Sequence, residues 1–146
     1  TTFLQQAWNV RDKSFGELRI GKTADEFIAG IEPMHGNALT VHRGGTRTVL
    51  TEDLNQGHAV GVADLLGNGK DQIVVGWREP NQENKVGIKI FTEDRKSTSG
   101  WKDFWNDDNS LACEDLQLAD LNGDGKKDII AAGRATRNVK VYWNRN

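Results

Sequence analysis

The sequence has little of several features that would define its class at once. It holds one cysteine, Cys113, which excludes an internal disulfide framework. Its apolar runs are about as long as a strand and far below the ~20 residues of a spanning helix, so no membrane partner is expected. The net charge is −2 with both signs mixed along the chain, which argues against a nucleic-acid partner.

Common catalytic motifs are also missing. The chain has no G-x-S-x-G turn, no H-E-x-x-H metal motif and no phosphate-binding glycine loop. Residues 1–10 lack the regions of a signal peptide, so we expect a soluble chain from which any such peptide is gone. Helical periodicity is weak, and sixteen glycines against two prolines indicate many tight turns. A single all-β domain over residues 1–146 is therefore predicted.

An internal repeat organises the chain. Residues 60–77, VGVADLLGNGKDQIVVGW, align without a gap through the loop with residues 116–133, LQLADLNGDGKKDIIAAG. Asp64 matches Asp120, a spacing of 56 residues. A third, less regular copy covers residues 17–43, with a shorter loop between its first two strands. Short strands between Gly, Asn and Asp turns, repeated near every 50 residues, predict blades of a β-propeller.

Each repeat unit is expected to hold four short strands. The three units are residues 1–43, 44–95 and 96–146, and their first strands are expected within residues 3–10, 46–53 and 100–107. This first strand is predicted to form the outer edge of the preceding blade, so the last blade lacks its own outer strand. Three blades do not close a ring.

We expect this open ring to be completed in one of two ways. Two chains pair head to tail, each lending its N-terminal strand to the other, and form a six-bladed homo-oligomer. Otherwise the chain is one piece of a larger propeller, whose other blades lie in missing sequence or in a different chain. An isolated three-blade arc would leave strand edges open, so a monomer is not expected.

The best-preserved loop, LADLNGDGKKDII at residues 118–130, has calcium-ligand spacing. Oxygen ligands are predicted from the side chains of Asp120, Asn122, Asp124 and Asp128 and from the carbonyl of Lys126. An EF-hand is excluded because position twelve is Ala131 and the flanks are strand-like. The alternative is a plain turn with solvated carboxylates.

The other copies serve as internal controls for this loop. The second copy has Asp64, Leu66, Asn68 and Gln72 at the ligand positions, and the first keeps only Asp25, so neither is expected to bind calcium. One calcium per chain is predicted, with a structural role.

Polar residues are predicted to gather on the opposite face, where the second strand of each blade ends and the innermost strand begins. Candidate catalytic residues are His35, His58, Glu114 and Arg134, and candidate ligand-binding residues are Glu32, Arg78, Asp115 and Asn138. A second divalent metal near His35 and His58 is possible. Each residue alone is more often a turn or solvated residue, and His42 is expected to pack or to be solvated. Trp77, Trp101 and Trp105 are expected to stack on sugars or to cover the seams between blades.

The motif ADLNGDGKKDI, followed by a strand that ends in glycine, resembles the FG-GAP/VCBS repeat family of propellers, in which this loop often holds calcium. The segments IEPMHGN, GHAVGVADL, ACEDLQLADLNGDG and GRATRNVKVYWN also resemble the propeller part of proteins related to aldos-2-ulose dehydratase, a carbohydrate lyase. These resemblances imply an extracellular or periplasmic protein.

Three functions are compatible with the sequence. The first is a calcium-stabilised module that binds a carbohydrate or protein ligand. The second is a lyase acting on a keto-sugar, with His35 or His58 as base and a metal or Arg134 stabilising the enolate. The third is a purely structural assembly unit.

Overall fold

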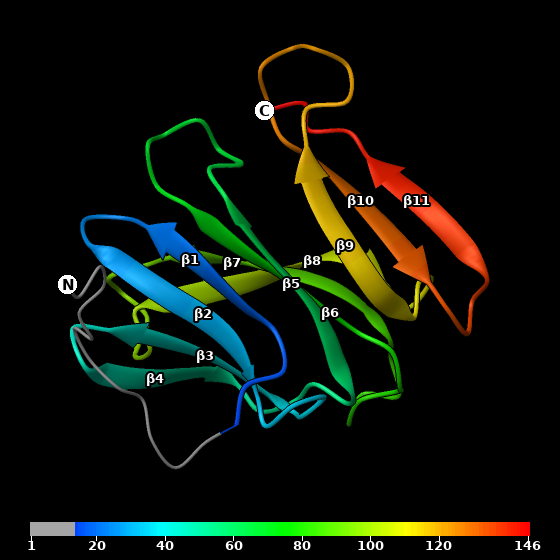
Figure 1. The fold of residues 1–146 in the computed structure, drawn as a ribbon, viewed down its shortest axis with the longest axis horizontal. Coiled ribbons are helices and arrows are strands. Elements are labelled where there is room, and N and C mark those ends of the chain that lie inside the picture. Colours follow the sequence, from blue (N-terminus) through cyan, green and yellow to red (C-terminus); the bar gives the residue numbers. More distant parts are fainter. Residues whose placement is uncertain (1–13) are drawn as a thin grey trace, which may run out of the picture.

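The structure is a computed structural model that describes residues 14–146, and all regular elements in that range are β-strands (Figure 1). The strands are β1 (Leu18–Lys22), β2 (Glu26–Glu32), β3 (Ala38–Arg43), β4 (Thr46–Thr51), β5 (Gly57–Ala63), β6 (Gln72–Trp77), β7 (Gly87–Glu93), β8 (Trp101–Asp108), β9 (Cys113–Ala119), β10 (Asp128–Gly133) and β11 (Asn138–Tyr142). The predicted all-β class is confirmed for these residues.

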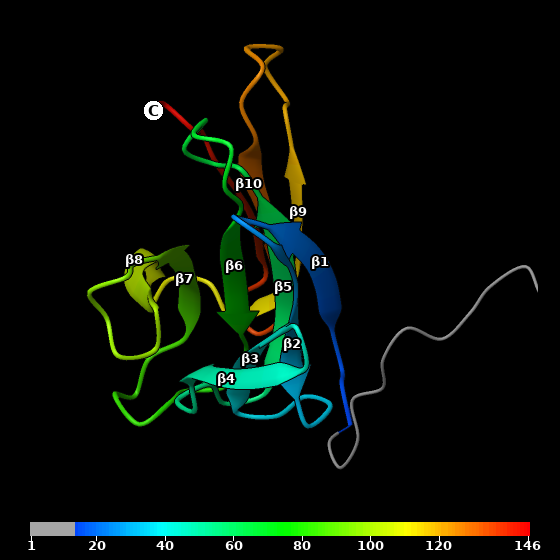
Figure 2. The ribbon, with the colours of Figure 1, turned by 90° about the vertical axis from the view of Figure 1, so that its left-hand side faces the viewer.

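The strands form three antiparallel sheets. Sheet 1 has the order β1-β2-β3-β4, sheet 2 the order β5-β6-β7-β8, and sheet 3 the order β9-β10-β11. The first strands of the sheets, β1, β5 and β9, lie next to one another, and the views in Figures 1 and 2 show the sheets fanning out from them. The described residues therefore form three blade-like sheets and do not form a closed ring.

The fourth strands belong to the preceding sheet, as the repeat predicts. The strands expected within residues 46–53 and 100–107 are β4 and β8, which pair with β3 and β7. Gly44 and Gly45 turn the chain between β3 and β4 with φ of 54° and 82°, a backbone that suits a tight hairpin between twisted strands. The strand expected at residues 3–10 lies outside the described residues.

Two hydrophobic clusters hold the sheets together. Phe27 and Ile31 of sheet 1 pack with Val75 of sheet 2, whereas Val74 faces the other way and packs with Leu116 of sheet 3. Successive residues of β6 are thus buried on both faces, which explains its continuous apolar run.

Three of the five tryptophans, Trp77, Trp101 and Trp105, lie at the seam between sheets 1 and 2. The ring of Trp101 meets Phe27 edge to face at a centroid distance of 5.4 Å, and Trp105 lies 5.3 Å from Trp77. Trp77 is 1% exposed, and Trp101 is also buried. The seam alternative therefore describes these side chains better than sugar stacking.

The single cysteine lies in the second cluster. Cys113 begins β9, and its side chain occupies the space where a Cβ of residue 76 would stand, so only glycine fits opposite it. Burial is the main cause that raises the pKa of its thiol to about 12, with the charge of Asp115 adding to the effect. The thiol is therefore protonated and unreactive at neutral pH.

Candidate functional site

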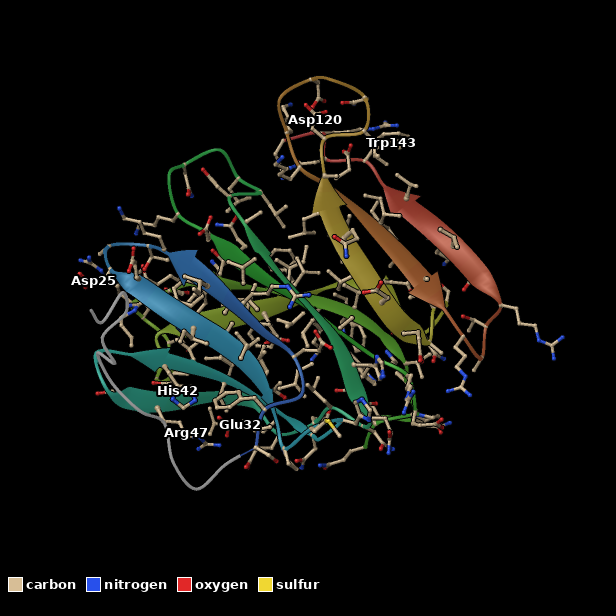
Figure 3. All side chains as sticks on the ribbon, in the orientation of Figure 1. Asp25, Glu32, His42, Arg47, Asp120 and Trp143 are labelled. Atoms are coloured by element: carbon tan, nitrogen blue, oxygen red, sulfur yellow. The ribbon has the colours of Figure 1, made fainter. Side chains whose placement is uncertain are left out.

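The turns after β2, β6 and β10 and the starts of β5 and β9 meet at one end of the sheets (Figure 1). Antiparallel pairing requires this, because each second strand returns to the end from which the first one left. The residues that gather there are His35, Gln56, His58, Arg78, Glu114 and Arg134, and they are called the rim cluster below. The loop containing Asp120 lies at the opposite end (Figure 3).

Glu114 is the centre of the rim cluster. Both of its carboxylate oxygens accept hydrogen bonds from Nη1 of Arg78 at 3.2 Å, and Nη1 of Arg134 lies 3.9 Å away. Partial burial acts to raise the pKa of Glu114, but the Arg78 hydrogen bonds and the nearby His58 together hold it below its ordinary value. The carboxylate is therefore ionised and fixed at neutral pH.

His58 connects the two sheets at this end. Its Nδ1 donates to the backbone carbonyl of Glu114 at 2.7 Å, so in the neutral ring the lone pair is on Nε2, which lies 3.8 Å from a Glu114 carboxylate oxygen. The two residues occupy equivalent repeat positions 56 residues apart. The repeat thus brings them together across the seam between sheets 2 and 3.

His35 stacks on His58. The two rings lie 4.4 Å apart between centroids and 22° from parallel. Nitrogen lone pairs lie in the ring plane, so those of nearly parallel stacked rings do not converge on one ion. A second metal between these rings would require one of them to turn, and it stays a prediction.

A groove borders the rim cluster on the side of sheets 2 and 3. It has a volume of about 650 Å³ and is lined by Gln56, Arg78, Glu79, Arg134, Ala135 and Arg137. Arg134 is 73% exposed, and its guanidinium is free to contact a ligand. Arg78 is held in place by Glu114 and by Gln56, whose Oε1 accepts from Nη2 at 3.0 Å.

Two rim residues are not evident from the sequence. Gln56 orients Arg78, and Arg137 lines the groove. Both have positive φ, 56° and 52°, at the ends of their turns. A polar residue next to a Gly-His pair and an arginine in a turn carry no motif, so only their contacts in the folded structure reveal them.

Glu32 does not belong to the rim surface, which corrects its predicted role in ligand binding. Its side chain is 1% exposed and accepts from Nε2 of His42 at 2.8 Å, Thr40 Oγ1 at 2.9 Å and Arg47 at 2.7 Å. Burial acts to raise the pKa of Glu32, but the Arg47 and His42 hydrogen bonds outweigh it and lower the pKa. Glu32, His42 and Arg47 form a network of hydrogen bonds and an ion pair within sheet 1, in which Glu32 and His42 are buried and Arg47 reaches the surface (Figure 3).

The two remaining predicted ligand-binding residues lie at the edge of the rim cluster. Asp115 is exposed, and its carboxylate accepts from the backbone N–H of Leu116 at 2.8 Å. The Asn138 side chain donates to the Ser110 carbonyl at 3.1 Å and accepts from Thr136 at 2.6 Å. Asn138 lines a second hollow with Glu114 and Arg134, separate from the groove, whereas Asp115 lines neither.

The predicted calcium loop is a compact turn between β9 and β10. Asp120 accepts from the backbone N–H groups of Gly125 at 2.8 Å, Gly123 at 2.7 Å and Asp124 at 3.2 Å. The Gly125 hydrogen bond is the largest cause of a lowered pKa for Asp120. Gly123 and Gly125 have φ of 77° and 85°, and the corresponding Gly67 and Gly69 have 65° and 78°. Both copies therefore make the same turn, whichever side chains they carry.

The oxygen donors of this loop suit a hard cation but are not gathered around a single point. Asn122 donates to Asp124 at 3.1 Å, and the carbonyl of Lys126 and the carboxylates of Asp120 and Asp124 remain near the surface. Asp128 is completely buried, and accepts from the backbone N–H groups of Leu121 and Asn144. No group of three or more His, Cys, Asp or Glu side chains in residues 14–146 is arranged to hold a metal.

The environment of Asp128 nevertheless favours a bound cation. Its carboxylate has no Lys, Arg or His partner within ion-pair distance among the described residues. Burying an unpaired carboxylate is costly, and a nearby divalent cation would offset that cost. By contrast, Gln72 at the equivalent position is neutral and accepts from Leu65 N–H at 2.7 Å.

Comparisons with known proteins return no relatives: no family description, no curated protein and no solved structure matches this chain. In the described part of the chain, no helix has the length and apolar character needed to cross a membrane.

Proposed function

We propose that this protein is a calcium-stabilised β-propeller module of the FG-GAP/VCBS type that binds a carbohydrate or protein ligand at the rim cluster. The observation that carries the proposal is the fixed Arg78–Glu114–His58 arrangement beside a groove with an exposed arginine. It offers oriented donors and acceptors from three distant segments, as recognition of a polar ligand requires. A carbohydrate matches this mixture of donors and acceptors best.

The binding proposal can be tested on a glycan array that includes neutral and acidic oligosaccharides. We expect the Arg134→Ala variant to bind at least about tenfold more weakly than the wild type, because a charged donor to the ligand is lost. Arg95→Ala is the matched control, since Arg95 is also exposed but lies in the turn between β7 and β8. Equal binding by the Arg134 variant would contradict the rim cluster as the binding site, and no glycan binding by the wild type would rule out the carbohydrate ligand.

A lyase is the second candidate, and the tautomer of His58 favours it. Because Nδ1 donates to a carbonyl, Nε2 can accept a proton from a substrate carbon next to a carbonyl group. The guanidinium of Arg134 would stabilise the resulting enolate. Incubating the wild type with keto-sugars and following elimination separates the two functions, and a lack of turnover on all of them would refute the lyase.

Calcium is proposed to stabilise the β9–β10 turn through Asp120, Asn122, Asp124, Asp128 and the carbonyl of Lys126. The cation supplies positive charge to carboxylates that otherwise rely on backbone N–H groups. Extracellular modules of this kind bind calcium at the concentrations found outside cells, which is consistent with an extracellular or periplasmic location.

We expect calcium to raise the melting temperature of the protein and a chelator to lower it. At a calcium concentration about 100 times Kd, binding to the native state adds about 2.7 kcal/mol. Asp124→Asn should abolish the calcium-dependent shift in a thermal melt. The control Asp64→Asn in the equivalent β5–β6 turn should retain it, and a melting temperature insensitive to calcium in the wild type would contradict the site.

A further inference from the structure

The outer edge of sheet 3 is open. Sheets 1 and 2 each have a fourth strand, whereas sheet 3 ends at β11. In sheet 2 this fourth strand, β8, places Trp101 and Trp105 into the seam with sheet 1. The corresponding seam between sheets 2 and 3 instead holds a groove of about 260 Å³, with Ile90, Phe104, Tyr142 and Trp143 in its lining (Figure 3 labels Trp143).

The sequence contains a segment that matches β8. Residues 4–9, LQQAWN, align with residues 101–106, WKDFWN, so that Trp8-Asn9 coincides with Trp105-Asn106. Leu4 and Trp8 then have the spacing of Trp101 and Trp105, which puts both on one face of a strand. As a strand, this segment would therefore present an apolar face to the groove.

Chain connectivity decides which copy supplies this segment. The chain runs from β4 of sheet 1 to β5 of sheet 2, and from β8 of sheet 2 to β9 of sheet 3. By the same connection, a strand that precedes β1 belongs to a sheet before sheet 1. No described sheet of this chain precedes sheet 1, so in a ring of two chains that position is taken by sheet 3 of the second copy.

The face of sheet 3 that points away from sheet 2 has apolar residues at the positions that are buried between sheets elsewhere in the structure. The register pairs Gly76 with Ile88 in sheet 2 and Ala132 with Val139 at the equivalent place in sheet 3. Ile88 is 0% exposed because sheet 3 covers it, whereas Val139 is 69% exposed. Val141 is likewise exposed where its equivalent, Ile90, is buried.

The opposite end face, on sheet 1, has exposed apolar residues on its innermost strand, and the register places the Glu32–His42–Arg47 network farther out on the same face. Leu18 and Ile20 of the innermost strand β1 are 49% and 70% exposed. Gly21, between Ile20 and Lys22, faces sheet 2, where a Cβ would meet Val62. Alternation therefore turns Leu18 and Ile20 away from sheet 2 and toward the free end.

We propose that a second copy of this chain closes the arc: sheet 3 of each copy packs on sheet 1 of the other, and residues 4–10 of each copy pair with the open edge of β11 in the other. Both interfaces are equivalent by two-fold symmetry, so the assembly closes at six sheets, within the range of propeller rings. This inference does not depend on the rim cluster binding a ligand.

The test is the mass of the particle in solution, measured by light scattering during size-exclusion chromatography. The wild type is expected at the mass of two chains. Val139→Asp and Trp8→Asp should each give folded particles of one chain, because each places a charge in an apolar contact. The control Leu66→Asp changes an equally apolar, exposed residue in the β5–β6 turn and should stay at two chains.

Mixing the two disrupted variants provides a second measurement. One copy of Trp8→Asp can accept the strand of one Val139→Asp copy, so a mixed pair retains one intact interface and should return a two-chain peak. A wild-type particle with the mass of one chain or of three chains would overturn the proposal. So would a two-chain particle that survives either substitution.

Discussion

Glu32→Ala is expected to lower the free energy of unfolding by about 1–3 kcal/mol, the cost typical of leaving a buried hydrogen-bond donor without its acceptor. The side chain is 1% exposed and neutralises Arg47 while holding His42. Without it, the ring of His42, itself 3% exposed, loses its acceptor at 2.8 Å. Urea unfolding monitored by tryptophan fluorescence measures the change.

Glu26→Ala is the matched control for this experiment. Glu26 begins the same strand, β2, but is exposed to solvent, so its removal should leave the free energy of unfolding nearly unchanged. An equally small effect for Glu32 would contradict the buried network. A large effect for Glu32 alone would establish that sheet 1 depends on it.

Asp107→Ala is expected to cost about 3 kcal/mol, because one carboxylate anchors sheet 3 to β8. Asp107 accepts from the hydroxyl of Tyr142 at 2.5 Å, from Nζ of Lys140 at 3.0 Å and from Ser110 at 2.7 Å. Its removal leaves the partly buried Tyr142 hydroxyl without its acceptor. The neighbouring Asp108→Ala removes an exposed carboxylate paired with Lys85 and should have little effect.

The contribution of Asp107 also has a defined pH dependence. Burial acts to raise the pKa of Asp107, but the hydrogen bonds from Tyr142 and Ser110 outweigh it and lower the pKa from 3.8 to about 2. Because the pKa of Asp107 is lower in the folded protein than in the unfolded chain, the ionised carboxylate stabilises the fold above pH 3.8. This contribution is lost as the pH falls toward 2. The stability difference between wild type and Asp107→Ala should therefore shrink between pH 4 and pH 2. A difference that stays constant over this range would contradict the linkage.

Much of the fold could be predicted from the repeat. Glycine-rich turns and short apolar runs give the strands, and the 56-residue spacing places His58 and Glu114 at equivalent points on neighbouring innermost strands. Their contact follows from that spacing alone, because equivalent positions of adjacent sheets lie side by side. The closed ring and the calcium site stay predictions.

The assignment of Glu32 could not be made correctly from the sequence. Its partners lie across strands, and the register that pairs Ile28 with His42 and His42 with Arg47 is a property of the folded sheet. The first repeat copy adds a further difficulty. Aligning residues 25–30, DEFIAG, with residues 71–76, DQIVVG, would put Phe27 and Ile73 on equivalent faces of sheets 1 and 2. Instead the two side chains face each other in the cluster between these sheets, so they lie on opposite faces. The shortened loop has reversed which face of β2 is apolar.

The buried thiol of Cys113 has a practical consequence for studying this molecule. Its side chain is 0% exposed and its pKa is raised to about 12, so maleimides and disulfide reagents find almost no thiolate there. A cysteine introduced at any surface position would then be the sole reactive thiol in the chain. The natural sequence is thus a ready background for site-specific fluorophores and spin labels, with which distances between the sheets or around the groove can be measured directly.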